Sequence, residues 1–186
     1  MARLTSPATS IDYILLGLLS NAPCHGYELH KQLTDLCGIG LLWRIKQPNL
    51  YALLEKLERR GWTQVVPGGE DTHPTRKQFG LTAEGERVFT LWLHSPVRRL
   101  RDMRQDFLAR LYFAQQVSDS LVRALIQQQG LVCQGWLHSL ERELATFTDR
   151  RDYQMSVCQF RVEQVRAMIT WLDWVWESYP VQEENR

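Results

Sequence analysis

Residues 47–62 carry amide, phenol and cationic side chains on one side and leucines on the other. The leucines recur at helical spacing and predict a buried helix face: Leu50, Leu53, Leu54 and Leu57. The opposite face carries Gln47, Asn49, Tyr51, Ala52, Glu55, Lys56 and Arg59. Amides at the start of a helix can pair with base edges in a major groove, and later cations can bind phosphates. The pattern therefore fits a DNA-recognition helix, although taken alone it favours an ordinary amphipathic surface helix.

The limits of this helix follow from two residues. Pro48 stands at the first helical position, where its missing N–H costs nothing. Gly61 stands just past the end, where it can take the left-handed conformation that closes many helices.

Each polar side chain of this region has a candidate role in DNA binding. Gln47 and Asn49 are candidates for base edges, because an amide can pair with adenine and discriminate by about 1–3 kcal/mol. The alternative is that Gln47 or Asn49 only caps the helix. The candidates for phosphate contacts are Arg44, Lys46, Lys56 and Arg59. In the following loop and strand, His73, Arg76 and Lys77 could reach a minor groove or the flanking backbone. Glu70 and Asp71 oppose a DNA contact by that loop.

Charge gives this prediction modest support. The 186-residue chain has a formal net charge of only +1, whereas many dedicated nucleic-acid binders are strongly basic. The one clear local excess lies in Arg44–Arg60, where five cations stand against two anions.

Other classes of site lack their patterns. Cys24, Cys37, Cys133 and Cys158 form no CxxC pair and have no histidines at zinc spacing, so neither a metal site nor a cofactor is expected. The sequence has no Gly-rich phosphate loop or nucleophile elbow, which argues against an enzyme. No apolar run reaches the roughly 18 residues of a membrane span, and no signal peptide precedes the first helix. We expect reduced thiols and a cytoplasmic protein.

The order of predicted elements is more informative than any single one. Helices are expected over about 9–20, 25–36 and 47–61, strands over 62–66 and 76–81, and a helix capped by Thr82 up to residue 94. Three helices followed by a two-stranded wing form a winged helix-turn-helix. The chain is thus predicted to be mainly α, with a DNA-binding domain over 1–94 and a second, helical domain over 95–186.

The second domain is expected to hold helices over about 97–116, 119–147 and 152–178. Gly130 and Gly135 mark a kink or close contact in the middle helix, or are simply tolerated there. The last helix is apolar over so wide an arc that it needs cover on more than one side. We expect a second copy of the chain to supply it, contacting Val162, Val165, Met168, Ile169, Leu172 and Trp176. The alternative is a larger intramolecular bundle.

Several motifs resemble the PadR family of bacterial transcriptional regulators. They are Ile14–Leu19, the run His25-Gly26-Tyr27-Glu28-Leu29, Asn49-Leu50-Tyr51, Leu54–Gly61 and Arg76–Gly85. Together they cover nearly all of residues 11–94, whereas the C-terminal helices resemble the family in pattern only. The sequence departs from the family at Pro48-Asn49, at Ala52 and at Gln78, where an aromatic is usual. The first departure lies on the predicted base-reading face.

The resemblance implies a dimeric repressor of an inverted-repeat operator in double-stranded DNA. It also implies that Tyr27 and Tyr51 lie near the DNA backbone, and that a small aromatic effector releases some members. Trp136 and Trp171 are the candidates for an effector site, although tryptophans at helical spacing usually fill a core. The alternative function is a winged-helix module that binds proteins and not DNA.

Overall fold

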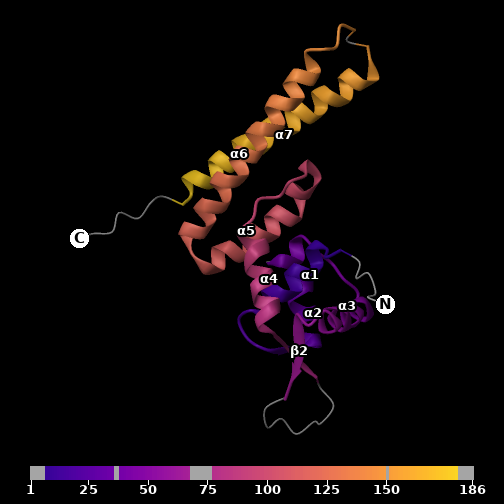
Figure 1. Ribbon diagram of the computed structural model, residues 1–186, viewed down its shortest axis with the longest axis vertical. Helices are drawn as coiled ribbons and strands as arrows, with labels where there is room; N and C mark the ends of the chain where they lie inside the picture. The colour runs from indigo at the N-terminus through magenta and orange to yellow at the C-terminus, as the bar shows by residue number, and fades with distance from the viewer. Residues whose placement is uncertain (1–6, 36–37, 68–76, 150, 180–186) are drawn as a thin grey trace, which may run out of the picture. The chain divides into compact units, whose positions relative to one another are not determined.

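The computed structural model describes residues 7–35, 38–67, 77–149 and 151–179. The elements of the first half are α1 (Ser10–Leu19), β1 (Cys24–His25), α2 (Gly26–Thr34), η1 (Ile39–Leu41), α3 (Gln47–Arg59), β2 (Thr63–Val66) and β3 (Gln78–Leu81). Those that follow are α4 (Ala83–Leu93), η2 (Leu100–Arg104), α5 (Asp106–Val117), α6 (Asp119–Leu144) and α7 (Tyr153–Glu177) (Figure 1). The predicted fold class, mainly α with a winged helix-turn-helix and long C-terminal helices, is confirmed.

The chain divides into two compact units. The N-terminal unit is Met1–Leu93 with Arg104–Phe113, and the C-terminal unit is His94–Met103 with Ala114–Arg186. The first part of α5 thus packs with the winged helix. The division into functional domains at residues 94 and 95 stays a prediction.

Helix α1 is the centre of the N-terminal unit. Its consecutive residues Ile14, Leu15 and Leu16 are all fully buried, so it is enclosed on every side. The reason is that α5 covers the remaining face. A Cβ atom added at Gly17 would lie 2.6 Å from the ring of Phe113, so only glycine lets these helices approach so closely.

The small sheet has three strands in the order β1-β3-β2, all antiparallel. The expected wing strands pair as Thr63↔Leu81 through Val66↔Gln78. The third strand, β1, was not expected from the sequence. It pairs Cys24 with Phe79 and His25 with Gln78, which ties the start of α2 to the wing.

Helices α6 and α7 form a long antiparallel hairpin in the C-terminal unit (Figure 1). Val162, Val165 and Leu172 of α7 are buried within this unit, and the Cys158 thiol donates to the Leu140 carbonyl at 3.4 Å. At Gly130 and Gly135 an added Cβ would meet nothing within 4 Å, so these glycines are tolerated and make no close contact. The expected helix over 97–116 is instead the short 3-10 turn η2 followed by α5 from Asp106.

Candidate nucleic-acid interface

Local sequence signals set both ends of α3. Pro48 lies in its first turn, and Gly61 follows its C-cap with φ +70° while its N–H donates to the Glu58 carbonyl at 2.9 Å. The imidazole of His30 lies 3.1 Å from the Ile45 carbonyl and holds the approach to the helix. Leu50, Leu54 and Leu57 are fully buried beneath it. The core therefore fixes which side of α3 faces outward.

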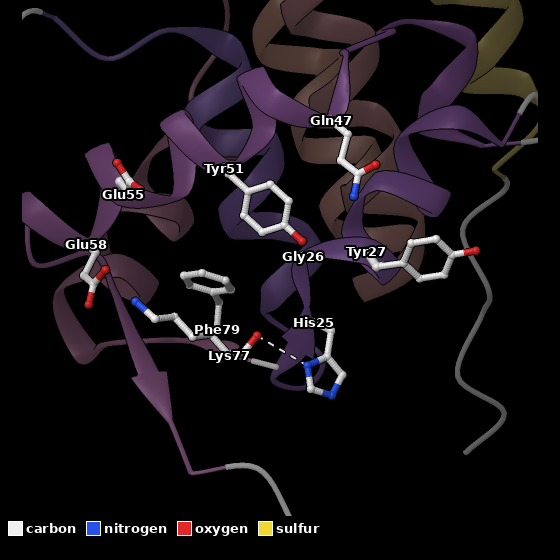
Figure 2. Close-up of a pocket in the computed structure, with 9 residues that line it drawn as sticks. All are labelled: His25, Gly26, Tyr27, Gln47, Tyr51, Glu55, Glu58, Lys77 and Phe79. Carbon is white, nitrogen blue, oxygen red and sulfur yellow. Dashed lines mark hydrogen bonds between the residues drawn. The ribbon is translucent and has the colours of Figure 1, made fainter. Parts of the chain in front are cut away.

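Beside the outward side of α3 lies a hollow of about 830 Å³ that we call the α3 hollow. It is bounded by the start of α2, by α3 and by β3. Its lining residues are His25, Gly26, Tyr27, Gln47, Tyr51, Glu55, Glu58, Lys77 and Phe79 (Figure 2). Gln47, Tyr51, Tyr27 and Lys77, four of the predicted DNA-binding residues, are thus brought together from three separate segments of the chain.

His25 and Gly26 shape one wall of the α3 hollow. The backbone N–H of His25 donates to Glu28 at 2.9 Å in a capping box, and its Nδ1 lies 3.3 Å from the Lys77 carbonyl oxygen. A Cβ at Gly26 would come within 2.7 Å of the Tyr51 ring. The glycine therefore lets Tyr51 lie across the start of α2, as Figure 2 shows. His25 therefore has a structural role here.

The α3 hollow is lined by both acidic and basic side chains. Tyr27 is 65% and Tyr51 41% exposed, so both phenol groups can reach a ligand. Figure 2 shows the ring of Tyr27 pointing away from Tyr51 and outward. Glu55 and Glu58 place two carboxylates at the end of the hollow nearest the C-terminus of α3. Within the α3 hollow, the end nearest the N-terminus of α3 is therefore the more favourable place for a phosphate.

The N-terminal end of α3 suits an anion. Lys46 is its N-cap residue and makes no side-chain cap hydrogen bond, so the positive end of the helix dipole stays available. Arg44 and Lys46, both exposed, precede it directly. Phosphate oxygens are the anions that such a combination binds best in a DNA-binding protein.

Gln47 and Asn49 do not share a face. At 3.6 residues per turn, side chains two residues apart point about 160° away from each other around the axis. Gln47 lines the α3 hollow with Tyr51, whereas Asn49 is exposed on the other flank. The two amides therefore cannot both address the same base pair from one docking of α3.

Lys56 is engaged within the protein. Its ammonium lies 2.7 and 2.9 Å from the two carboxylate oxygens of Asp12, which is fully buried in α1. Arg60 approaches the same carboxylate at 3.7 Å. These contacts anchor the C-terminal half of α3 to the core and leave Arg59, which is exposed, as the cation that faces solvent there. Asp12 was missed as a partner, although a carboxylate within the apolar run Ile11–Leu19 was a usable signal.

The remaining predicted residues fall outside the α3 hollow. His73 and Arg76 lie outside the described residues. Trp136 of α6 is half-buried and lines a second hollow in the C-terminal unit, while Trp171 is half-buried on α7 and does not line it. Sequence reasoning missed the contributions of Gly26 and Phe79, which reach the α3 hollow only through the pairing of β1 with β3.

The predicted dimerisation residues divide into two groups. Val162, Val165 and Leu172 are covered within the single chain, whereas Met168, Ile169 and Trp176 are half-buried. A different line of α7 is exposed and repeats every seven residues: Tyr153, Phe160, Ala167 and Trp174. The first stripe thus packs inside the C-terminal unit, and the second has no cover among the described residues.

Three helices with a wing, and α3 presented outward beside it, define the winged helix class of DNA-binding folds. The family model "Transcriptional regulator PadR-like family" matches residues 15–91, and the model "Virulence activator alpha C-term" matches residues 103–179. Residues 15–91 thus match the PadR-like family of transcriptional regulators, a family of DNA-binding proteins and not of enzymes.

Solved structures give distant matches. Bacillus subtilis PadR in complex with operator DNA is 21% identical, with a TM-score of 0.43 over 92% of this chain and 100% of that chain. The complex of B. subtilis PadR with p-coumaric acid is 21% identical, with a TM-score of 0.41 over 92% of this chain and 99% of that chain. A PadR-like transcriptional regulator from Bacillus cereus is 20% identical, with a TM-score of 0.40 over 94% of this chain and 98% of that chain. No curated protein matches.

Two negative findings hold for the part of the chain that the structure describes. No helix there combines the length and the apolar character needed to cross a membrane. The same residues bring together no three His, Cys, Asp or Glu side chains in a way that could hold a metal ion.

Proposed function

We propose that this regulator binds double-stranded DNA as a homodimer, with the N-terminal half of α3 in the major groove of each half-site. The observation that carries the proposal is the α3 hollow, where Gln47, Tyr51 and Tyr27 share one face beside the cationic start of α3. Gln47 can read a base edge, and the two phenols can donate to backbone phosphates. Arg44 and Lys46 supply further phosphate contacts.

The wing takes a smaller part in this proposal. Lys77 lies on the opposite side of the α3 hollow from α3 and can reach the backbone that flanks the groove. Asn49 would contact the strand on the other flank of α3. Lys56 contributes by fixing α3 on Asp12, because its ammonium already has a carboxylate partner.

A second copy of the chain would cover the exposed stripe of α7. Tyr153, Phe160 and Trp174 are 80%, 62% and 64% exposed, and large aromatics repeating every seven residues form a seam for another helix. Such a dimer would present two α3 helices to half-sites about 34 Å apart, which is one turn of DNA. Sedimentation of the double variant Phe160→Glu/Trp174→Glu tests this: we expect a monomer, whereas an unchanged dimer would place the interface elsewhere.

Repression of a promoter by occupancy of its operator is the regulatory outcome that we propose, in the cytoplasm where bacterial DNA lies. Release by a small molecule is part of this proposal. It draws on the family and on the B. subtilis relative whose structures hold operator DNA and p-coumaric acid.

One observation favours a different function. Glu55 and Glu58 line the α3 hollow, and the net charge is only +1, so the same surface could bind a basic protein segment. The salt dependence of DNA affinity separates the two functions, because each phosphate contact releases counterions and adds about 0.9 to the slope of log K against log salt. We expect a slope steeper than about −4 for the dimer, and a lower slope for the double variant Arg44→Gln/Lys46→Gln. A slope near zero would favour the protein-binding function.

A further inference from the structure

Glu55 places a carboxylate on the α3 hollow that the contacts proposed above do not use. It is exposed, and its side chain takes part in none of the ion pairs found among the described residues. Two other glutamates of the N-terminal unit are engaged within the protein. Glu28 accepts the backbone N–H of His25 at 2.9 Å, and Glu84 pairs with Arg87 at 2.7 Å. The Glu55 carboxylate is therefore available to accept hydrogen bonds from a ligand.

Glu55 stands on the same stripe of α3 as Gln47 and Tyr51. The three residues follow one another at intervals of four, so their side chains lie within about 80° of each other around the axis and line the hollow together (Figure 2). The eight residues from Gln47 to Glu55 span about 12 Å along the axis. Base pairs of DNA are stacked about 3.4 Å apart, so a helix lying along the groove carries Glu55 about three base pairs beyond Gln47.

The second carboxylate of the hollow is placed less well for such a contact. Side chains of a helix lean toward its N-terminus, so each one covers the turn that precedes its own Cα atom. Glu55 thereby reaches back toward the middle of α3. Glu58 lies in the last turn of the helix, where it covers the end that the proposed docking leaves outside the groove. Of the two, Glu55 is the carboxylate that can meet a base edge.

Charge and hydrogen-bonding capacity define what this carboxylate can contact. It carries only acceptors, and it repels the phosphates of the DNA backbone. In the major groove, the exocyclic amines of cytosine and adenine are the donors. Adenine also presents its N7 acceptor beside the amine, and guanine and thymine present acceptors only. Cytosine is thus the one base whose major-groove edge offers a donor and no acceptor, so a carboxylate held there selects cytosine.

We propose that Glu55 is a specificity-determining residue, whose carboxylate accepts a hydrogen bond from the exocyclic amine of one cytosine in each half-site. This inference rests on the function proposed above, because it requires α3 in the major groove. Opposite any other base the carboxylate faces an acceptor and loses its water without gaining a partner, which lowers affinity for that sequence. An anion on this surface thus contributes selectivity through the sequences that it rejects.

Selection from random-sequence duplexes with the full-length wild type, Glu55→Gln and Glu55→Ala tests the proposal. We expect the wild type to prefer cytosine at least about fivefold over each other base, about three base pairs from the position that Gln47→Ala relaxes. Glu55→Gln should change this preference to adenine, because an amide pairs with N6 and N7 of adenine. Glu55→Ala should abolish it. Both variants should keep the preference at the position read by Gln47, which shows that they fold and dock.

Glu86→Gln is the matched control. Glu86 is exposed on α4, belongs to none of the ion pairs of the described residues and does not line the α3 hollow, so its loss of charge should leave the selected sequence unchanged. A wild-type motif that Glu55→Gln leaves unchanged, or that Glu86→Gln alters in the same way, would overturn this inference alone. Enrichment of no sequence by the wild type would overturn the proposed function together with it.

Discussion

Replacing Asp12 by asparagine should destabilise the protein through the ion pairs that anchor α3. The carboxylate is fully buried, receives the ammonium of Lys56 at 2.7 and 2.9 Å, and accepts the backbone N–H of Thr9 at 2.8 Å. Removing one partner of a buried ion pair typically costs 3–5 kcal/mol. Because the Lys56 side chain is 23% exposed and can regain water, we expect the lower end, about 3 kcal/mol of unfolding free energy.

Urea denaturation of the wild type and of Asp12→Asn measures this loss. The control is Glu84→Gln, which removes an ion pair on the surface of α4 between side chains that are 60% and 50% exposed, and should leave the midpoint unchanged. A double variant Asp12→Asn/Lys56→Met should recover part of the lost stability, because the ammonium that Asp12→Asn leaves without its carboxylate is then removed as well. A loss below about 1 kcal/mol for Asp12→Asn would refute the reasoning, since it would mean that the pair is solvated.

Three further predictions follow from single residues. Gly135→Ala should raise the free energy of unfolding by about 1 kcal/mol, because its Cβ meets open space in a helix, whereas Gly61→Ala should lower it by about 1–2 kcal/mol because φ is +70°. Both free energies of unfolding are measured by urea denaturation, and a lower value for Gly135→Ala would reveal a contact at that position. Burial, reinforced by the carboxylate of Glu28, raises the pKa of Cys24 to about 11, so its alkylation, followed by mass spectrometry, should keep accelerating with pH up to that value. A plateau of the Cys24 alkylation rate near pH 9 would contradict a raised pKa. Arg59→Gln should lower the salt slope of DNA binding by about one for each subunit of the proposed dimer, whereas Lys56→Gln should leave the slope unchanged, and an equal loss of slope in both variants would place both cations on phosphate.

Features that depend on neighbouring residues could be predicted from the sequence. Pro48 and Gly61 define the ends of α3 by their own backbone preferences, and Thr82 accepts the N–H of Gly85 at 3.0 Å as a helix cap should. The wing strands likewise follow from alternation and turn residues. Local signals of this kind act within a few residues, so periodicity and caps are sufficient to find them.

Features that depend on distant pairing could not be predicted. Strand β1 is only two residues long and exists because Cys24 pairs with Phe79 far along the chain. The ion pair of Asp12 with Lys56 joins α1 to α3 in the same way. Such contacts are decided by tertiary packing, which leaves no periodic trace in either segment.

The last helix shows how an apolar pattern can be correct while its partner is misjudged. Apolar side chains do lie around much of α7, as the sequence predicted. However, Val162 and Leu172 are covered by the chain itself, and Phe160 and Trp174 are exposed. Composition along a helix reveals both stripes but does not say which one packs internally.

Selection from random-sequence duplexes, followed by sequencing, tests the central claim most directly. The wild-type protein would be compared with Gln47→Ala, which lines the α3 hollow, and with Asn49→Ala on the other flank of α3. We predict an inverted repeat with half-site centres about 10 base pairs apart, in which Gln47→Ala relaxes the preference at one position of each half-site. Enrichment of no sequence at all, or a motif that Gln47→Ala leaves unchanged, would contradict the claim that this face of α3 reads DNA.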